Sequence, residues 1–471
     1  MGQDRPNLLL IMCDELRFDA LGCYGNPVIK TPNIDRLAAE GVLLEHYFSQ
    51  SPVCQPSRAT LATGRYPHVH GVRWNWYDLD AREVTLQTLL SQSEYSTWAV
   101  GKMHFEPTTE SHGFQNRVFV EGKLFTGDDE YRQHLSRIGK RQLYYQHVKR
   151  WNNDDDFGAA VSPLSDDDYI DTYIGQNAVR VLSQVTAPFF VWVSFVNPHF
   201  PFDPPQPFAT MYDPKMMPLP QDFHFNQTSR IPEQRVASAS RSFHQLTEDH
   251  MRKIIAYYYG TISLVDREVG RIMDSLKDRG LLDETVIVFA SDHGDLLGHR
   301  GMLWKGRMLY DHLIRVPMIV RYPKELASGK VVSHLCQVTD VMPTFLDFAG
   351  IVIPTGVQGR SLRSILKQEA VPWRDAVFSE VMDLKMVRDF HWKLIFYPGR
   401  SYGELYHIAV DPLELNNLYD HPDYERRRSA LIEKLANLLI QTEDPLPLAH
   451  LRSGYAEISG VHSTFELGPI G

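Results

Sequence analysis

Four short, strongly apolar runs constrain the fold of this chain more than any other feature of its sequence. They lie at residues 8–12, 189–196, 286–290 and 317–320. Runs of this length that are rich in Val, Ile, Leu and Phe are typical of strands buried on both faces, as in a parallel sheet. Helical patterns lie between them: one begins at Pro32 and ends at Gly41, and a longer one ends at Gly280. This alternation predicts an α/β fold for residues 1–365.

The C-terminal region has a different pattern. Segments 376–382 and 392–397 are predicted strands, and the dipeptide Pro398-Gly399 marks a turn after the second one. A helix follows, with four leucines on one face: Leu431, Leu435, Leu438 and Leu439. We therefore predict that residues 366–471 form a smaller α+β domain, in which a helix covers an antiparallel sheet. The tail after Pro445 is rich in Gly, Pro and Ser, so it is either loose or held by another subunit.

Two polar regions, residues 105–168 and 197–250, have the character of insertions. Both show little periodicity, and long loops in a compact domain usually act as lids or binding loops. The first contains two acidic clusters, at 154–156 and 166–168. Solvated charge, or acids at the start of a helix, explains such clusters more simply than a cation site does.

Charge and cysteine content exclude several classes of protein. The 471 residues include 48 Lys and Arg against 58 Asp and Glu, and the net charge of -10 argues against a nucleic-acid partner. The four cysteines are scattered and form no CxxC pair, so they predict a reducing compartment rather than a disulfide scaffold. No apolar run is long enough for a membrane span, and the N-terminal run at residues 8–12 is shorter than the core of a signal peptide. We therefore expect a cytoplasmic protein that binds no membrane.

Two pairs of polar residues follow predicted strands directly. Asp14 and Glu15 come after the first apolar run, and Asp292 and His293 come after the third. Ligands of open α/β sheets bind outside the carboxyl ends of the strands, so the two pairs are expected to meet there. Three carboxylates and one imidazole suit calcium, magnesium or manganese. The alternative is that these acids cap the helices that follow.

The densest chemical signal lies around Cys54. Pro56 can open a helix directly after the cysteine, and Arg58 stands one turn further on. A nucleophile at a helix N-terminus beside a guanidinium suits an anionic substrate. Taken alone, such a cysteine is more often an inert buried thiol than a nucleophile. Three residues separate Cys54 from Arg58 in the sequence, which is fewer than the five of a cysteine-phosphatase loop.

Several motifs together resemble one family. The sequence C-Q-P-S-R-A-T-L-A-T-G-R closely resembles the first signature of the type I sulfatases, in the alkaline phosphatase superfamily, and Y-S-T-W-A-V-G-K-M-H resembles their second. Other segments that resemble the family are N-P-H-F-P-F, S-D-H-G, M-L-W-K-G and the C-terminal E-L-Y-H-I-A-V-D-P-L-E-L-N-N-L. These motifs begin in order at residues 54, 95, 197, 291, 302 and 404. The resemblance thus covers nearly the whole chain.

The resemblance implies a fold and an activity. The expected fold is a large mixed, mostly parallel sheet flanked by helices, with a smaller C-terminal α+β domain. The expected activity is hydrolysis of sulfate monoesters through formylglycine, an aldehyde that a separate maturation enzyme makes from Cys54. One hydroxyl of the hydrated aldehyde would attack sulfur and the other would later expel the sulfate, which is covalent catalysis with a self-cleaving intermediate.

The resemblance also implies a role for each motif residue. The expected metal ligands are Asp14, Glu15, Asp292, His293 and the formylglycine at Cys54. The cations that hold the diol and neutralise the sulfate are Arg58, Lys102 and Lys305. The histidines are His199, as general acid to the leaving alcohol, and His104, in contact with the diol or the sulfate. The histidines that follow the first signature, His68 and His70, are interpreted as structural. For Trp74 and Trp76, lining of the substrate cleft and core packing both stay open.

Four positions depart from the common pattern. Gln55 is larger than the usual residue after the cysteine, and Glu94 stands where the second signature usually has glycine. Glu15 and His293 resemble the bacterial branch of phosphonate monoester hydrolases and broad-specificity arylsulfatases, whose metal can be manganese. An imidazole ligand favours a transition metal such as Mn²⁺ over Ca²⁺. Calcium stays open as the alternative, so the expected metal is Ca²⁺ or Mn²⁺. Relatives in that branch are often dimers or tetramers, so a homo-oligomer is expected here.

Two other functions fit the same motifs. One is hydrolysis of phosphonate monoesters or phosphodiesters, because these are singly charged tetrahedral anions like sulfate esters. The other is a catalytically silent binder of sulfated ligands. The alcohol of the substrate is open among sugars, aryl alcohols and small alkyl alcohols.

Overall fold

The computed structural model describes the whole chain except residues 1–4, 126, 150–155, 226–230, 242 and 444–471. An eight-stranded sheet forms its centre, in the order β4-β3-β5-β1-β6-β7-β2-β8. The strands are β1 Asn7–Asp14, β2 Val42–Phe48, β3 Ser96–Gly101, β4 Asn116–Phe119, β5 Phe189–Pro198, β6 Thr285–Ser291, β7 Met318–Arg321 and β8 Lys330–Gln337. Neighbours pair in parallel, except that β7 runs antiparallel to both β6 and β2. The predicted mixed, mostly parallel sheet is confirmed.

The apolar runs form the centre of this sheet because both of its faces are covered. Every residue of β1 is buried, and its side chains alternate between two separate apolar cores. Leu9 and Ile11 belong to one core, whereas Leu8, Leu10 and Met12 belong to the other. A strand that contributes to two cores needs apolar residues at every position, which explains the continuous run.

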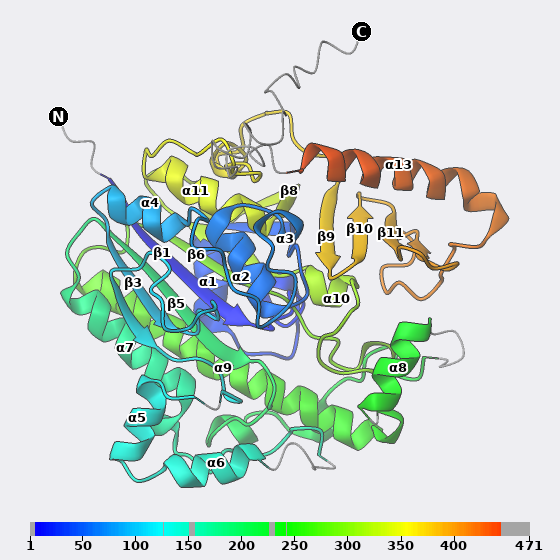
Figure 1. Ribbon diagram of the computed structural model, residues 1–471. Helices are drawn as coiled ribbons and strands as arrows, with labels where there is room; N and C mark the ends of the chain where they lie inside the picture. The colour runs from blue at the N-terminus through cyan, green and yellow to red at the C-terminus, as the bar shows by residue number, and fades with distance from the viewer. Residues whose placement is uncertain (1–4, 126, 150–155, 226–230, 242, 444–471) are drawn as a thin grey trace, which may run out of the picture.

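Helices cover the two faces, as Figure 1 shows. On one face lie α1 Pro32–Glu40, α7 Ile170–Gln184 and α9 Glu248–Asp278. On the other lie α2 Cys54–Thr63, α4 Leu86–Gln92, α11 Val341–Phe348 and α12 Arg363–Leu366. Shorter or peripheral helices are α3 Pro67–His70, α5 Glu130–Arg137, α6 Arg141–Lys149, α8 Pro232–Ser240 and α10 Asp311–Ile314. Among the described residues, no helix is both long and apolar enough to cross a membrane.

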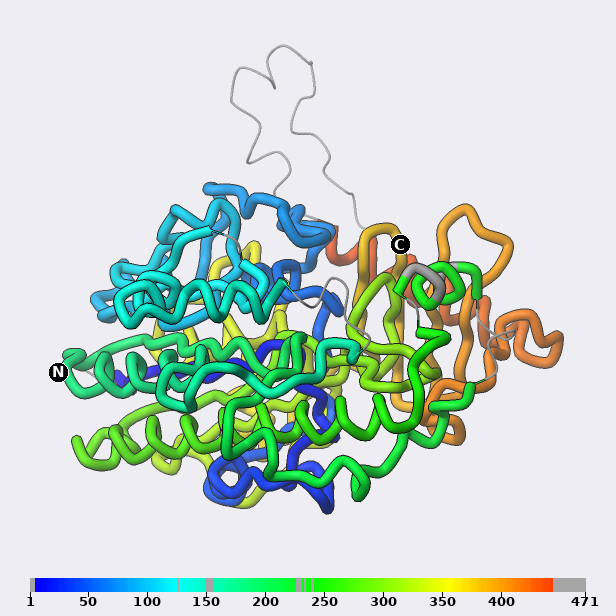
Figure 2. The backbone as a smooth tube through the Cα atoms, turned by 90° about the horizontal axis from the view of Figure 1, so that it is seen from below, coloured from blue at the N-terminus to red at the C-terminus, as the bar shows by residue number. Residues whose placement is uncertain are grey.

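The predicted small C-terminal sheet is present. Its antiparallel order is β12-β11-β10-β9, with α13 packed on one side. The bounds are β9 Val377–Val381, β10 Leu384–Arg388, β11 Lys393–Phe396, β12 Glu404–Tyr406 and α13 Glu425–Gln441. In Figures 1 and 2 this unit, orange to red, lies at one end of the molecule. The boundary at residue 365 stays a prediction, and the tail after Pro445 lies outside the described residues.

The two predicted insertions contain more regular structure than their sequences indicated. The first supplies β4, which extends the large sheet, together with α5 and α6, and the second supplies α8. Three acids of the two acidic clusters form ion pairs. Asp166 pairs with Arg267, Asp168 with Lys140, and Asp156 with Lys253. Asp154 and Asp155 lie outside the described residues.

Gly101 ends β3 in a conformation that leaves no room for a side chain. Its φ is +97°, and a Cβ there would lie 2.1 Å from the Ser194 carbonyl oxygen. We expect Gly101→Ala to lower the free energy of unfolding by about 3 kcal/mol through backbone strain and overlap. Gly399→Ala is the matched control: φ is +69°, nothing lies within 4 Å of the added Cβ, and the expected loss is about 1 kcal/mol. Urea unfolding of both variants measures the difference, and equal losses would contradict the close approach.

Candidate active site

The site forms where β1 and β6 end side by side. The two strands pair in parallel as far as Cys13 and Ser291, so the residues that follow each strand are neighbours in space. The backbone N–H of Glu15 donates to Asp292 Oδ1 at 3.1 Å, which ties the two strand ends together. This is the edge of the sheet at which the sequence predicted that the two polar pairs meet.

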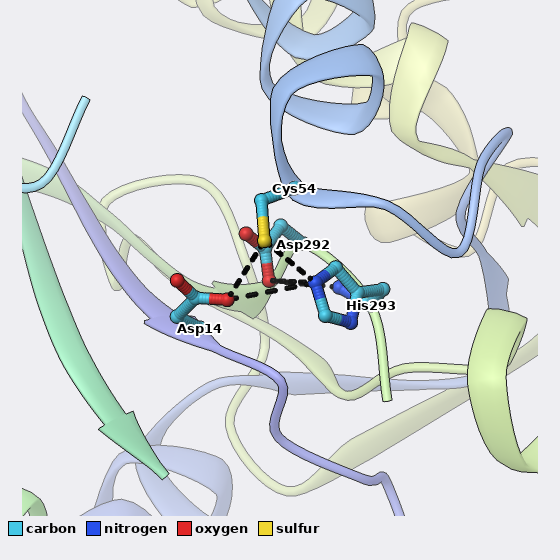
Figure 3. A group of neighbouring side chains, drawn as sticks. All are labelled: Asp14, Cys54, Asp292 and His293. Carbon is cyan, nitrogen blue, oxygen red and sulfur yellow. Dashed lines mark hydrogen bonds and ion pairs between the residues drawn. The ribbon is translucent and has the colours of Figure 1, made fainter. Parts of the chain in front are cut away.

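Four side chains converge at this edge, as Figure 3 shows. The group consists of Asp14, Cys54, Asp292 and His293, and their potential ligand atoms all lie within 4.8 Å of one another. Cys54 Sγ lies 3.4 Å from Asp14 Oδ1 and 3.1 Å from His293 Nε2. Each of the four is at most 1% exposed. The donor set of carboxylate oxygen and imidazole nitrogen fits a divalent metal.

The orientation of His293 suits ligation. Its Nδ1 lies 2.8 Å from the Gly294 carbonyl oxygen, which can only accept a hydrogen bond. Nδ1 therefore carries a proton, and Nε2, the nitrogen that remains for a metal, faces Cys54 and Asp14. A ring fixed through its second nitrogen is the usual arrangement around a metal-binding histidine.

Glu15 reaches the site in a second, overlapping group. The structure places it with Asp14 and His199, again within 4.8 Å, rather than in the group of four. Its Oε2 lies 3.0 Å from Lys305 Nζ and 3.3 Å from His199 Nε2. Its Oε1 is buried and accepts no hydrogen bond from the described residues. Burial raises the pKa of Glu15 to about 7.

Three cations balance the three carboxylates. Arg58 Nε donates to Asp292 Oδ2 at 2.7 Å, Lys102 Nζ donates to Asp14, and Lys305 pairs with Glu15 as described. Burial opposes ionisation of Asp14, but Lys102 and the other cations outweigh it and hold its pKa well below the usual range. Because each of these carboxylates already has a cationic partner, a divalent metal would leave the site net positive, which suits an anionic ligand.

The thiol of Cys54 is protonated at neutral pH. Burial, reinforced by the charge of Asp14, raises its pKa to about 12. Cys54 is the first residue of α2, and Arg58 follows it one turn later on the same helix. The predicted helix start after Cys54 is therefore present.

Both predicted histidines line the site in their neutral form. Burial, followed by the charge of Lys102, lowers the pKa of His104 well below its usual value. Burial, followed by Lys305, does the same for His199. The backbone of His104 has φ +56°, and its N–H donates to Glu121 Oε1 at 3.1 Å. Its Nδ1 has no hydrogen-bond partner among the described residues.

The residues that the sequence left as structural or ambiguous are also placed. His68 contacts Glu380 at 2.7 Å, and His70 Nε2 lies 3.0 Å from Thr60 Oγ1, so both join parts of the fold. Trp74 packs against the core. Trp76 is 71% exposed and lies beside His104.

Sequence reasoning missed three residues that support the site. Ser194 Oγ accepts from Arg58 at 2.8 Å, and its polar side chain inside an apolar run was the available signal. Glu121 anchors the backbone of His104. Lys123 Nζ, buried, donates to the carbonyls of His199 and Pro201 and to Asp203 Oδ1, at 3.3, 2.6 and 2.7 Å. Glu121 and Lys123 lie in the first insertion, where no motif marks them.

Comparison with known proteins decides the family. The family model described as sulfatase matches residues 6–351. The chain belongs to the sulfatase family. It is accordingly a hydrolase that acts on sulfate esters. A second model, the C-terminal region of N-sulphoglucosamine sulphohydrolase, matches residues 298–441 of this sulfatase.

Individual relatives resemble this sulfatase over almost its full length. An arylsulfatase of Clostridium perfringens is 30% identical, covering 93% of this chain and 94% of the relative. An N-acetylglucosamine-6-O-sulfatase of Bacteroides thetaiotaomicron is 26% identical, covering 94% and 88%. Among solved structures, the phosphonate monoester hydrolase of Agrobacterium radiobacter is 27% identical and covers 95% of this chain and 98% of its own, with a TM-score of 0.82.

Lys123 is expected to hold the loop that carries His199. Lys123→Met leaves the buried Asp203 without its lysine partner, although Tyr169 still donates to Asp203 Oδ1 at 2.9 Å and His147 Nε2 lies 3.2 Å from Oδ2. We expect the free energy of unfolding to fall by about 3 to 5 kcal/mol. The double variant Lys123→Met/Asp203→Asn removes the uncompensated charge and is expected to recover part of that loss. If the double variant is less stable than Lys123→Met, the pairing of Lys123 with Asp203 is not what stabilises this loop.

Proposed function

We propose that this sulfatase cleaves sulfate monoesters through a formylglycine formed from Cys54, assisted by a divalent metal. The supporting observation is the convergence of Cys54 with Asp14, Asp292 and His293 in one buried group. Three cationic side chains, Arg58, Lys102 and Lys305, surround that group.

The aldehyde at position 54 supplies a hydrated diol, of which one hydroxyl attacks sulfur and the other releases the sulfate. The Sγ atom of Cys54 marks where one diol oxygen would lie. In the folded chain Cys54 is 1% exposed. A maturation enzyme that acts on this residue therefore has to reach it before the chain has folded.

The metal ligands in this proposal are Asp14, Glu15, Asp292 and His293, together with an oxygen of residue 54. When bound, the metal lowers the pKa of the diol and polarises one sulfate oxygen. The imidazole of His293 favours Mn²⁺, whereas the carboxylates suit Ca²⁺ equally well. The orphaned Oε1 of Glu15 is consistent with a group that has a further partner in the loaded enzyme.

The remaining motif residues act on the substrate. Arg58 and Lys102 orient residue 54 and, with Lys305, neutralise the charge that builds on the sulfate oxygens. His199 holds its ring through Nδ1, whose N–H donates to the Phe200 carbonyl. To act as general acid to the leaving alcohol from Nε2 it must first take up a second proton, and the negative charge of a bound substrate favours that imidazolium form. His104 contacts the diol or the sulfate.

Hydrolysis of phosphonate monoesters is the second candidate. Two observations favour it: the similarity to the phosphonate monoester hydrolase of Agrobacterium radiobacter, and the presence of Glu15 and His293 at the metal site. A cationic pocket does not discriminate between sulfate and phosphonate monoesters, since both are singly charged tetrahedral anions.

Turnover of matched p-nitrophenyl sulfate and p-nitrophenyl phenylphosphonate decides between the two. We expect a higher kcat/KM for the sulfate ester, and a strong preference for the phosphonate would overturn the proposal.

Cys54→Ala is expected to lower kcat at least about 10³-fold, because it removes the nucleophile. Cys336→Ala, which changes a buried thiol away from the site, is the control and should keep kcat within about twofold.

Metal content and thermal stability test the ligand set independently of turnover. We expect one divalent ion per chain and a rise in Tm when Mn²⁺ is added to metal-free protein. His293→Asn removes the imidazole ligand and should weaken Mn²⁺ relative to Ca²⁺ at least about tenfold. His68→Asn, outside the group, is the control. Equal metal preference in the wild type and His293→Asn would exclude His293 as a ligand.

The cytoplasmic location and the homo-oligomeric state stay predictions. The mass of the protein in solution tests the second: a dimer or tetramer is expected, and a monomer at micromolar concentration would contradict it.

A further inference from the structure

An exposed aromatic ring stands at the edge of the site. Trp76 is 71% exposed, yet its ring meets the ring of His104 edge-on, with the centroids 6.0 Å apart. Its backbone has φ +71°, a left-handed conformation that a bulky residue adopts only at a cost. An apolar ring displayed on a strained backbone beside a buried histidine points to a function for that surface.

Gln55 holds this strained loop in place. Gln55 is 1% exposed, and its side-chain amide bonds to the backbone of two successive residues. Oε1 accepts from the N–H of Trp76 at 2.5 Å, and Nε2 donates to the carbonyl of Tyr77. The backbone N–H of Gln55 in turn donates to Asn75 Oδ1 at 3.2 Å. The residue directly after Cys54 therefore fastens residues 75–77 to the N-terminus of α2.

This arrangement explains why position 55 departs from the small residue expected there. A smaller side chain lacks the amide that satisfies both the N–H of Trp76 and the carbonyl of Tyr77. The amide group fixes the loop relative to Cys54, so the ring of Trp76 keeps a set position relative to the reacting group. A rigid aromatic surface beside a polar pocket is well suited to contact the apolar part of a ligand.

We propose that Trp76 forms a wall of the leaving-group site and selects sulfate esters whose alcohol carries a ring, a pyranose or an aryl group. Gln55 is the positioning residue for that wall. The proposal rests on the proposed sulfatase function, in which the sulfate lies over Cys54 and His199 protonates the oxygen of the leaving alcohol; it adds that the rest of the alcohol extends along His104 to Trp76. An open aromatic face matches the flat face of a ring, whereas a quaternary ammonium is usually enclosed by several aromatic side chains.

The test compares kcat/KM on four sulfate esters for the wild type and Trp76→Ala. The ring-bearing substrates are p-nitrophenyl sulfate and N-acetylglucosamine 6-sulfate, and the acyclic ones are ethyl sulfate and choline O-sulfate. We expect the ratio of ring-bearing to ethyl turnover to fall about tenfold, mainly through KM, as lost stacking implies. Trp76→Phe should retain most of the ratio. Phe390→Ala, at another exposed aromatic residue (44% exposed), should leave it unchanged.

Two outcomes would overturn the proposal: an unchanged ratio in Trp76→Ala, or a loss confined to choline O-sulfate, which would indicate a cation site. Gln55→Ala should lower the same ratio, and adding it to Trp76→Ala should have little further effect, because Gln55 acts through Trp76. Additive losses would contradict the positioning role. As a control, the mass of the peptide that carries residue 54 is measured in each variant, to check that conversion of Cys54 to formylglycine is equal.

Different results would contradict the proposed sulfatase function and the proposed role of Trp76. If the wild type hydrolyses no sulfate ester but turns over phosphonates, the sulfatase assignment fails. The ratio of kcat/KM is then measured with the phenyl and ethyl esters of methylphosphonate. If Trp76 contacts the leaving group, Trp76→Ala should lower the phenyl-to-ethyl ratio in the same way.

Discussion

Three carboxylates, Asp14, Glu15 and Asp292, lie buried at the ends of two neighbouring strands, and each is paired with a cationic side chain. Burial of an unpaired charge costs several kcal/mol, so these pairs determine where the surrounding segments can lie. Arg58 has to approach β6, which fixes α2 and with it the position of Cys54. The geometry of the nucleophile thus follows from an electrostatic requirement of the strand ends.

Much of the site was predictable because it depends on local order in the sequence. Polar pairs directly after buried strands were expected to meet, and Asp14 and Asp292 do so in the register of β1 and β6. Five further motif residues reach the same edge of the sheet: Arg58, Lys102, His104, His199 and Lys305. The resemblance to a family added the roles, which the residues alone left open.

The features that escaped prediction depend on contacts distant in the sequence. The direction of β7 is one, because an apolar run is the same whether its neighbours are parallel or antiparallel. The short strands β10 and β12 are another, since three to five residues carry a weak signal. Lys123 supports the loop of His199 from 76 residues away, and no local pattern indicates such a pairing. Gln55 was noticed only as an anomaly, and its partners explain it.

The mass of one peptide tests the account most directly. Trypsin releases residues 37–58, which carry Cys54 and end at Arg58. In protein made by its native host, we predict that this peptide has lost the mass that separates a CH2–SH group from an aldehyde. An unmodified thiol in all of that material would contradict the formylglycine mechanism and leave the metal site without its nucleophile.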